Sequence, residues 1–181
     1  IASMIEQGAR IRGVVGSLWT LQVYGSSAWL TPFETTLGRL LASVESFNVE
    51  QKVWSSEPPL PSGRMGHAAV VIDGRIYVTG GYAGYKASDT GFVPVRLSAV
   101  ASWAPGEFAW REEAATSVGR SGHAAVAHRG AIWILGGVTE TPSAGCRVSA
   151  VEVLRVAAAA DKWEIVPQMI LPRFCLGAAI A

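Results

Sequence analysis

Short runs of apolar and β-branched residues, each preceded by a two-residue turn, form the clearest hydrophobic pattern of the chain. Two such runs extend from Arg75 to Thr79 and from Ala131 to Leu135. They follow Asp73-Gly74 and Arg129-Gly130, and the glycine of such a pair supplies the positive φ that a tight hairpin turn requires. The pattern therefore predicts two β-hairpins.

The hairpin segments belong to an internal repeat of about 55 residues. The sequence R-M-G-H-A-A-V at 64–70 returns as R-S-G-H-A-A-V at 120–126, which is 56 residues later. Trp54, Trp110 and Trp163 follow the same period, with separations of 56 and 53 residues. A fixed period of this size is typical of architectures in which each repeat forms one structural unit.

Paired glycines and small residues complete each repeat. Gly80-Gly81 and Gly136-Gly137 end the second run, where missing side chains permit a sharp bend and the close approach of a neighbouring backbone or of an aromatic ring. Ala68-Ala69 and Ala124-Ala125 suit a strand near a crowded axis, because the blades of a propeller taper inward. We therefore expect four short strands per repeat, stacked radially.

With these motifs the sequence resembles the kelch-repeat β-propeller family, which has a double glycine followed by an aromatic residue, six further residues and a Trp. The resemblance implies an all-β fold: an incomplete kelch-type propeller of about three four-stranded blades plus a fragment. The third repeat departs from the pattern at Val156, where an aromatic residue is expected, and the first has Gln22-Val23 in place of the double glycine. The residues that carry the resemblance are Phe47, Trp54, Gly80, Gly81, Trp103, Trp110, Gly136, Gly137 and Trp163.

The expected repeats do not add up to a closed ring. They occupy residues 1–57 as a degenerate blade, 64–113 and 120–166 as two blades, and 172–181 as the start of a further blade. A propeller typically needs four to eight blades to close. Either the same polypeptide supplies the remaining blades or another chain does, and the sequence leaves both possibilities open.

Composition and charge narrow the class of partner. Fifteen Lys and Arg against 14 Asp and Glu give a formal net charge of +1, so we expect neither nucleic acid nor an anionic membrane as a partner. Although 50% of the residues are hydrophobic, no apolar run approaches the roughly 20 residues of a membrane span. No Asn lies in an N-x-S/T acceptor sequence, which favours an intracellular location, cytoplasmic or organellar.

Residue types that carry catalysis or bind metals do not converge in the sequence. Cys146 and Cys175 lie far apart without neighbouring ligands, which indicates neither a disulfide framework nor a zinc site. His67 and His123 occupy matching positions in the repeat, and we interpret them as structural. No nucleophile, phosphate-loop or zinc-protease motif is present. We therefore expect a protein without catalysis, metal or cofactor. The alternative is a propeller enzyme of the copper-oxidase or sugar-epimerase kind, whose active site lies largely outside this segment.

Three arginines, Arg64, Arg120 and Arg173, recur at the start of the first strand of successive repeats. Propeller symmetry would place them in a ring on one face, and in kelch adaptors that recruit other proteins arginines at similar places look toward acidic peptide segments. The planar guanidinium suits this role, because it can bind a carboxylate through two parallel hydrogen bonds. The alternative is that each arginine braces the loop between two blades. The expected function is protein binding, either as an adaptor or as a structural scaffold in a multi-subunit complex, with other proteins as partners.

Overall fold

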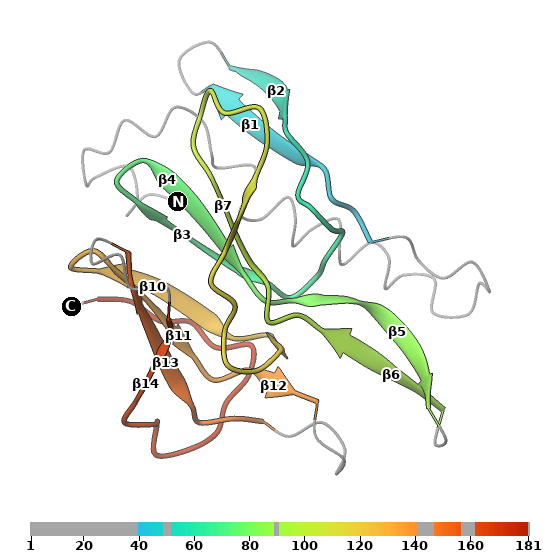
Figure 1. Cartoon of the computed structure of the whole chain (residues 1–181), viewed down its shortest axis with the longest axis vertical. Helices are drawn as coiled ribbons and strands as arrows, with labels where there is room; N and C mark the ends of the chain where they lie inside the picture. Colours follow the sequence, from blue (N-terminus) through green and yellow to red (C-terminus); the bar gives the residue numbers. More distant parts are fainter. Residues whose placement is uncertain (1–39, 49–51, 89–90, 141–146, 157–161, 181) are drawn as a thin grey trace.

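Two four-stranded antiparallel sheets dominate the computed structural model (Figure 1). The structure describes residues 40–48, 52–88, 91–140, 147–156 and 162–180. Within these ranges every regular element is a strand, and the sheets do not close into a ring. The all-β fold and the incomplete propeller predicted from the sequence are both confirmed.

The central blade has the strand order β3-β4-β7-β8. Its two inner strands meet at Asp73-Gly74, where Gly74 has the positive φ that the sequence predicts, 76°, and Asp73 has a positive φ of 49° as well. The register runs without interruption from the Ala68–Thr79 pair to the Ile72–Arg75 pair. The strands are β3 (Ala68–Ile72), β4 (Arg75–Thr79), β7 (Val100–Trp103) and β8 (Arg111–Glu113).

The C-terminal blade repeats this plan with the order β10-β11-β13-β14. Its inner turn lies at Arg129-Gly130, with φ angles of 49° and 68°. The two inner strands pair from Ala124–Leu135 to His128–Ala131, which matches the central blade residue for residue. The strands are β10 (Ala124–His128), β11 (Ala131–Leu135), β13 (Val151–Arg155) and β14 (Glu164–Val166).

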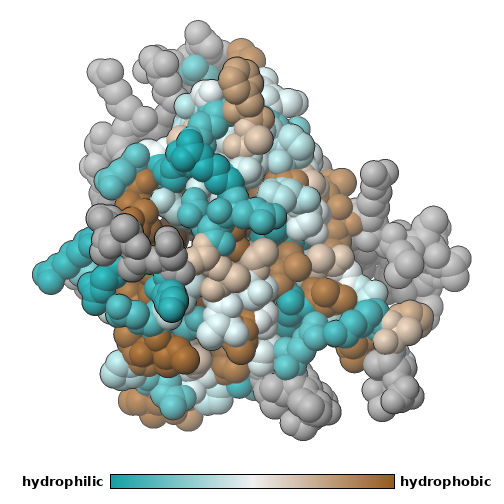
Figure 2. Space-filling model, in the orientation of Figure 1, coloured by the Kyte–Doolittle hydropathy of each residue, from teal (hydrophilic) through white to brown (hydrophobic). Residues whose placement is uncertain are grey.

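Three two-stranded sheets flank the blades. One lies where the outer strands of the preceding blade are expected, and it pairs Phe47 with Trp54. The inner strands expected for that blade fall within residues 1–39, outside the described residues. A second is a hairpin between β4 and β7 that projects from the side of the molecule (Figure 1), and hydrophobic and hydrophilic groups lie next to each other along it (Figure 2). The three sheets are β1 (Val44–Asn48) with β2 (Val53–Glu57), β5 (Tyr82–Ser88) with β6 (Gly91–Arg96), and β9 (Arg120–Ser121) with β12 (Val138–Thr139).

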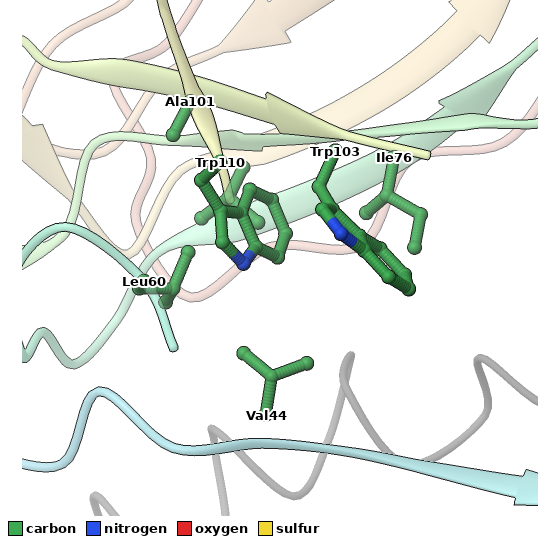
Figure 3. Packing of buried hydrophobic residues seen from close by; sticks show 7 residues of the cluster. Val44, Leu60, Ile76, Ala101, Trp103 and Trp110 are labelled. Atoms are coloured by element: carbon green, nitrogen blue, oxygen red, sulfur yellow. The ribbon is translucent and has the colours of Figure 1, made fainter. Parts of the chain in front are cut away.

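The core of the central blade is a stacked tryptophan pair. Trp103 and Trp110 have ring centroids 6.0 Å apart, and Val44 from β1 and Leu60 cover them (Figure 3). The Trp110 indole N–H donates to the carbonyl of Pro58 at 2.7 Å, so the polar atom of this buried ring is satisfied. This arrangement joins the β1–β2 hairpin to the central blade.

A second core fills the interface between the two blades. Tyr77 and its neighbours from the central blade pack against Ile132, Ile134 and Leu154 of the C-terminal blade. Trp163 lies at the margin of this core, and its indole N–H donates to Ala114 O at 2.8 Å, as that of Trp110 does in the preceding core. The repeat in sequence is therefore also a repeat of the interblade packing.

In the third repeat, Leu154 and not Val156 occupies the position where the family has an aromatic residue. The 53-residue spacing assigns Val156 to the place of Trp103. In the sheets, however, Ile76 pairs with Trp103 and the equivalent Ile132 pairs with Leu154. Leu154 thus takes the place of Trp103, because two more residues separate it from the following Trp than in the central blade.

The double glycines lie where the next repeat crosses the blade. Gly81 donates its N–H to Arg120 O at 2.8 Å, and Gly137 donates to Arg173 O at 2.7 Å. A Cβ on Gly80 would lie 2.5 Å from the Arg120 oxygen, closer than any side chain can approach. The glycines therefore permit a backbone-to-backbone contact between successive repeats.

Residues 172–180 continue the path of the repeat, although no strand is assigned to them. Cys175 donates its N–H to Gly122 O at 2.7 Å, just as Gly122 donates to Gly66 O at 2.7 Å. Cys175 also adopts a positive φ of 50°, close to the 63° of Gly122. The segment thus follows the interblade geometry, while the exact limits of each repeat stay a prediction.

Candidate interaction surface

Arg120 is fully buried and serves as an internal brace. One of its nitrogens, Nη1, donates to Gly136 O at 3.1 Å, and Nη2 forms an ion pair with the buried carboxylate of Glu152. The second oxygen of Glu152 accepts the N–H of Ser117 at 2.9 Å. The pair therefore ties the loop before β9 to the double glycine and to β13. Sequence reasoning did not single out Glu152, whose acidic side chain lies between Val151 and Val153 in the sequence.

Arg64 occupies the equivalent place in the preceding repeat and is also buried. It donates to Gly80 O at 3.3 Å and to Ser62 Oγ at 3.0 Å. Burial lowers the pKa of Arg64, and also that of Arg120, where the nearby Glu152 opposes the effect. This geometry favours the bracing alternative for both residues. Of the three arginines in the sequence motif, only Arg173 is exposed. Partner binding by these arginines therefore stays a prediction for Arg173 alone.

The two repeated histidines are buried at the blade interfaces. His123 Nε2 shares a hydrogen bond of 2.8 Å with Thr79 Oγ1 of the central blade. Burial, reinforced by the neighbouring arginine charges, lowers the pKa of His67 to about 4 and that of His123 to about 3. Both rings are therefore neutral near pH 7. Their place and charge agree with a structural role.

Two other arginines lie at equivalent positions and remain accessible. Arg96 directly precedes Leu97, whose N–H donates to Gly81 O at 2.8 Å; Arg147 directly precedes Val148, whose N–H donates to Gly137 O at 2.9 Å. The Arg96 side chain is half-buried and the Arg147 side chain is exposed. The repeat therefore places a guanidinium at the same end of each blade.

Both guanidiniums contact the residue that directly follows the repeated arginine of the next repeat, Arg120 or Arg173. Arg96 Nε donates to Ser121 Oγ at 3.2 Å, and the Arg147 guanidinium carbon lies 4.9 Å from the centre of the Phe174 ring. Val138 connects the two contacts, because it pairs with Ser121 and forms a β-bridge with Arg147. We call these five residues, Arg96, Ser121, Val138, Arg147 and Phe174, the arginine row.

Sequence reasoning missed the arginine row because it has no fixed period. Arg96 follows its double glycine by 15 residues and Arg147 follows its own by 10. The difference lies in the connection to the third strand, which contains the β5–β6 hairpin in the central blade. The only local signal is the apolar residue that follows each arginine at the end of this connection.

A carboxylate anchors the hairpin beside the arginine row. Glu140 accepts the Arg96 backbone N–H at 2.8 Å and the Lys86 ammonium at 3.1 Å. The backbone hydrogen bond, with a smaller contribution from Lys86, lowers the pKa of Glu140. Glu140 therefore stays charged near pH 7 and partly offsets the positive charges of Lys86 and Arg96.

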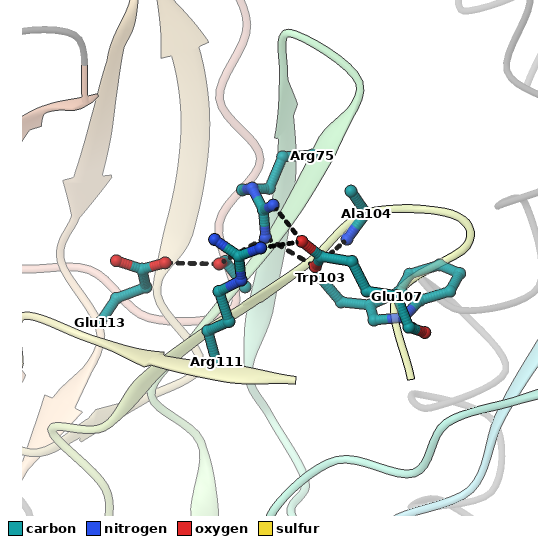
Figure 4. Close-up of polar contacts among 7 residues, drawn as sticks. Arg75, Trp103, Ala104, Glu107, Arg111 and Glu113 are labelled. Carbon is teal, nitrogen blue, oxygen red and sulfur yellow. Dashed lines mark hydrogen bonds and ion pairs between the residues drawn. The ribbon is translucent and has the colours of Figure 1, made fainter. Parts of the chain in front are cut away.

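A second group of ionisable residues lies at the opposite end of β4, beside the inner turn (Figure 4). Arg75 Nη1 donates to Glu107 Oε2 at 2.9 Å, and Arg111 also pairs with this carboxylate. The hydrogen bonds from Arg75 and from the Ala104 N–H hold the pKa of Glu107 down at about 2. Since Arg75, Arg111 and the Ala104 N–H all bind Glu107, we interpret the group as a brace of the β7–β8 loop.

The described residues contain no group of three or more His, Cys, Asp or Glu side chains that could hold a metal ion. They likewise contain no helix that is long and apolar enough to cross a membrane. Asp89, Cys146 and Asp161 lie outside the described residues.

Comparison with known proteins identifies a recurrent motif in the chain. The family model for the Kelch motif matches residues 63–93 and 119–170. Human Kelch-like protein 34 is 32% identical over 144 residues, which is 79% of this chain and 20% of the relative. Alpha-scruin from Limulus polyphemus is 36% identical over 56% of the chain and 11% of the relative, and Kelch-like protein 40 from Xenopus laevis is 33% identical over 57% and 16%. The chain thus spans a fifth or less of the length of these relatives.

Proposed function

Because the chain belongs to the kelch-repeat family, a group of protein-interaction and structural modules, we propose that its arginine row binds an acidic segment of a partner protein. The observation that carries the proposal is the recurrence of an accessible guanidinium, Arg96 and then Arg147, at the same place on two successive blades. An extended acidic segment that crosses the blade ends would meet both.

The chemistry of the row suits carboxylates. The planar guanidinium can donate two parallel hydrogen bonds to one carboxylate. The Arg147 guanidinium lies over the Phe174 ring, and a cation–π contact of this kind uses no N–H donor, so the donors stay available for a carboxylate. Arg96 uses Nε for Ser121, so its terminal nitrogens are the groups that would meet a partner.

The role is that of an adaptor or of a structural scaffold in a larger assembly, inside the cell. A repeated binding surface is compatible with the adaptor role and with the scaffold role. The relatives include Kelch-like proteins as well as scruins. No observation in the described residues favours the enzymatic alternative, so protein binding is the function we propose.

The test measures binding of a fluorescent deca-glutamate peptide to the intact protein that contains these repeats. We expect the double variant Arg96→Gln/Arg147→Gln to weaken binding about tenfold, because it removes two charge-assisted contacts. The matched control is Arg129→Gln/Arg155→Gln, which removes two exposed arginines from the opposite end of the C-terminal blade. Equal loss in both double variants would mean unspecific attraction and would overturn the proposal.

A further inference from the structure

The β5–β6 hairpin has one apolar face. Tyr85 pairs directly with Pro94, and Ala87 pairs with Phe92. Residues that face each other across an antiparallel pair point to the same side of the sheet, so these four side chains lie together. Lys86 pairs with Val93 and belongs to the other side. We call Tyr85, Ala87, Phe92 and Pro94 the apolar hairpin face.

This face is open to solvent. Phe92 is 75% exposed and Tyr85 is 49% exposed, whereas Trp103 and Trp110 of the adjoining blade are buried. Figure 2 shows hydrophobic groups beside hydrophilic ones along the hairpin. Neighbouring exposed aromatic side chains are typical of surfaces that bind other proteins.

The hairpin is held in place at its base. Met65 and Tyr82 exchange two backbone hydrogen bonds, of 3.0 and 2.8 Å. Lys86 and the Arg96 backbone both bind Glu140 of the C-terminal blade. A partner would therefore meet a surface that is already ordered, which lowers the entropy cost of binding.

The apolar hairpin face continues into the arginine row along one strand. In β6 the side chains alternate, so Phe92, Pro94 and Arg96 point to the same side. Phe92 and Arg96 are four positions apart in extended chain, a distance of about 13 Å. Pro94 lacks an N–H donor, which disfavours the addition of a further strand along β6 and favours packing on the face.

We propose that the apolar hairpin face binds an aromatic or large aliphatic side chain of the same partner segment whose carboxylates meet the arginine row. The occupant is an extended segment of another protein with an apolar residue about four positions from an acidic pair, since this spacing matches the Phe92–Arg96 distance. Charge complementarity at one end and apolar contact at the other set its direction. This inference rests on the proposed function of the arginine row.

The experiment compares two labelled peptides on the intact protein by fluorescence anisotropy. One has Phe four residues before a Glu-Glu pair in an otherwise Ser-Gly chain, and the other has Ala in place of Phe. We expect the Phe peptide to bind about tenfold more tightly than the Ala peptide. The double variant Tyr85→Ser/Phe92→Ser should abolish this difference and leave the affinity for the Ala peptide unchanged.

Two controls separate the possible outcomes. Phe108→Ser removes an aromatic side chain that is 100% exposed in the β7–β8 loop, and it should leave both affinities unchanged. Arg96→Gln/Arg147→Gln should weaken both peptides alike. An unchanged circular dichroism spectrum and melting temperature of each variant show that the fold is intact.

Equal affinity for the two peptides, with a loss in the arginine variant, would overturn the hairpin inference and leave the proposed function standing. No effect of the arginine variant would overturn the proposed function itself. Sedimentation of the free protein tests the other occupant: a dimer that Tyr85→Ser/Phe92→Ser dissociates would assign the apolar hairpin face to a second copy of the chain and overturn the inference.

Discussion

Thr79 at the end of β4 and His123, directly before β10, share a buried hydrogen bond of 2.8 Å between Oγ1 and Nε2. The bond crosses from the central blade to the C-terminal blade. At the next interface Leu135 stands in the place of Thr79 and Leu176 in the place of His123, as the equivalent contacts of Gly122 and Cys175 indicate. One interface thus uses a polar pair where the next has two leucines.

The polar pair predicts a double-mutant cycle. Thr79→Leu should destabilise the protein by about 1–3 kcal/mol, because the buried His123 nitrogen loses its partner. Thr79→Leu/His123→Leu should cost less than the sum of the single changes, since it reproduces the chemistry of the following interface. Urea unfolding of the four proteins measures the coupling. Strict additivity would mean that the hydrogen bond contributes nothing to the interface.

The buried histidines predict loss of stability in mild acid. Their folded pKa values, about 4 for His67 and about 3 for His123, lie below the ordinary 6.5, so the unfolded chain takes up protons first as the pH falls. Their contribution is fully present above pH 6.5 and is lost as the pH falls towards the folded values. Between pH 6 and 5 we expect a slope approaching about 1.4 kcal/mol per pH unit for each histidine.

Unfolding by urea at pH 7.5, 6 and 5 measures this dependence, in a range that lies above the ordinary pKa of Glu. His67→Gln/His123→Gln should flatten the profile, whereas His128→Gln, at a half-buried position beside a turn, should retain it. A profile that stays steep in the first variant would assign the pH dependence to other groups.

The Arg120–Glu152 pair predicts a large asymmetry between single and double changes. Glu152→Ala should destabilise by about 3–5 kcal/mol, because it leaves the fully buried Arg120 charge without its counter-ion. Arg120→Met/Glu152→Leu should cost much less, since neither charge remains. Thermal and urea unfolding give both values. A loss below about 1 kcal/mol for Glu152→Ala would show that the arginine finds water or another partner.

The double glycine predicts a steric effect separate from backbone strain. Gly80→Ala should destabilise by about 3 kcal/mol or more, because the new Cβ would lie 2.5 Å from Arg120 O at a φ of +59°. Gly74→Ala has a similar φ of +76° but no atom within 4 Å, and should cost only about 1 kcal/mol. Comparable losses in the two variants would show that the close approach of the next repeat is not the constraint at Gly80.

The sequence by itself determined the repeat, the inner hairpins and the family. Asp73-Gly74 and Arg129-Gly130 predict their turns correctly because turn geometry depends on two adjacent residues and on the alternation of the strands beside them. The fixed spacing of the 64–70 and 120–126 motifs predicts the stacking of the blades in the same way, because nearly identical segments form the same structural unit in each repeat.

Only the tertiary structure decided which charged residues are internal and which face a partner. Arg64 and Arg120 have the sequence pattern of a surface ring, but the carbonyls of the double glycines, and for Arg120 also Glu152, hold them inside. Arg96 and Arg147 come to equivalent places although their connections differ in length, so no period in the sequence marks them. Burial and accessibility depend on contacts between residues far apart in the chain, and the fold alone brings those residues together.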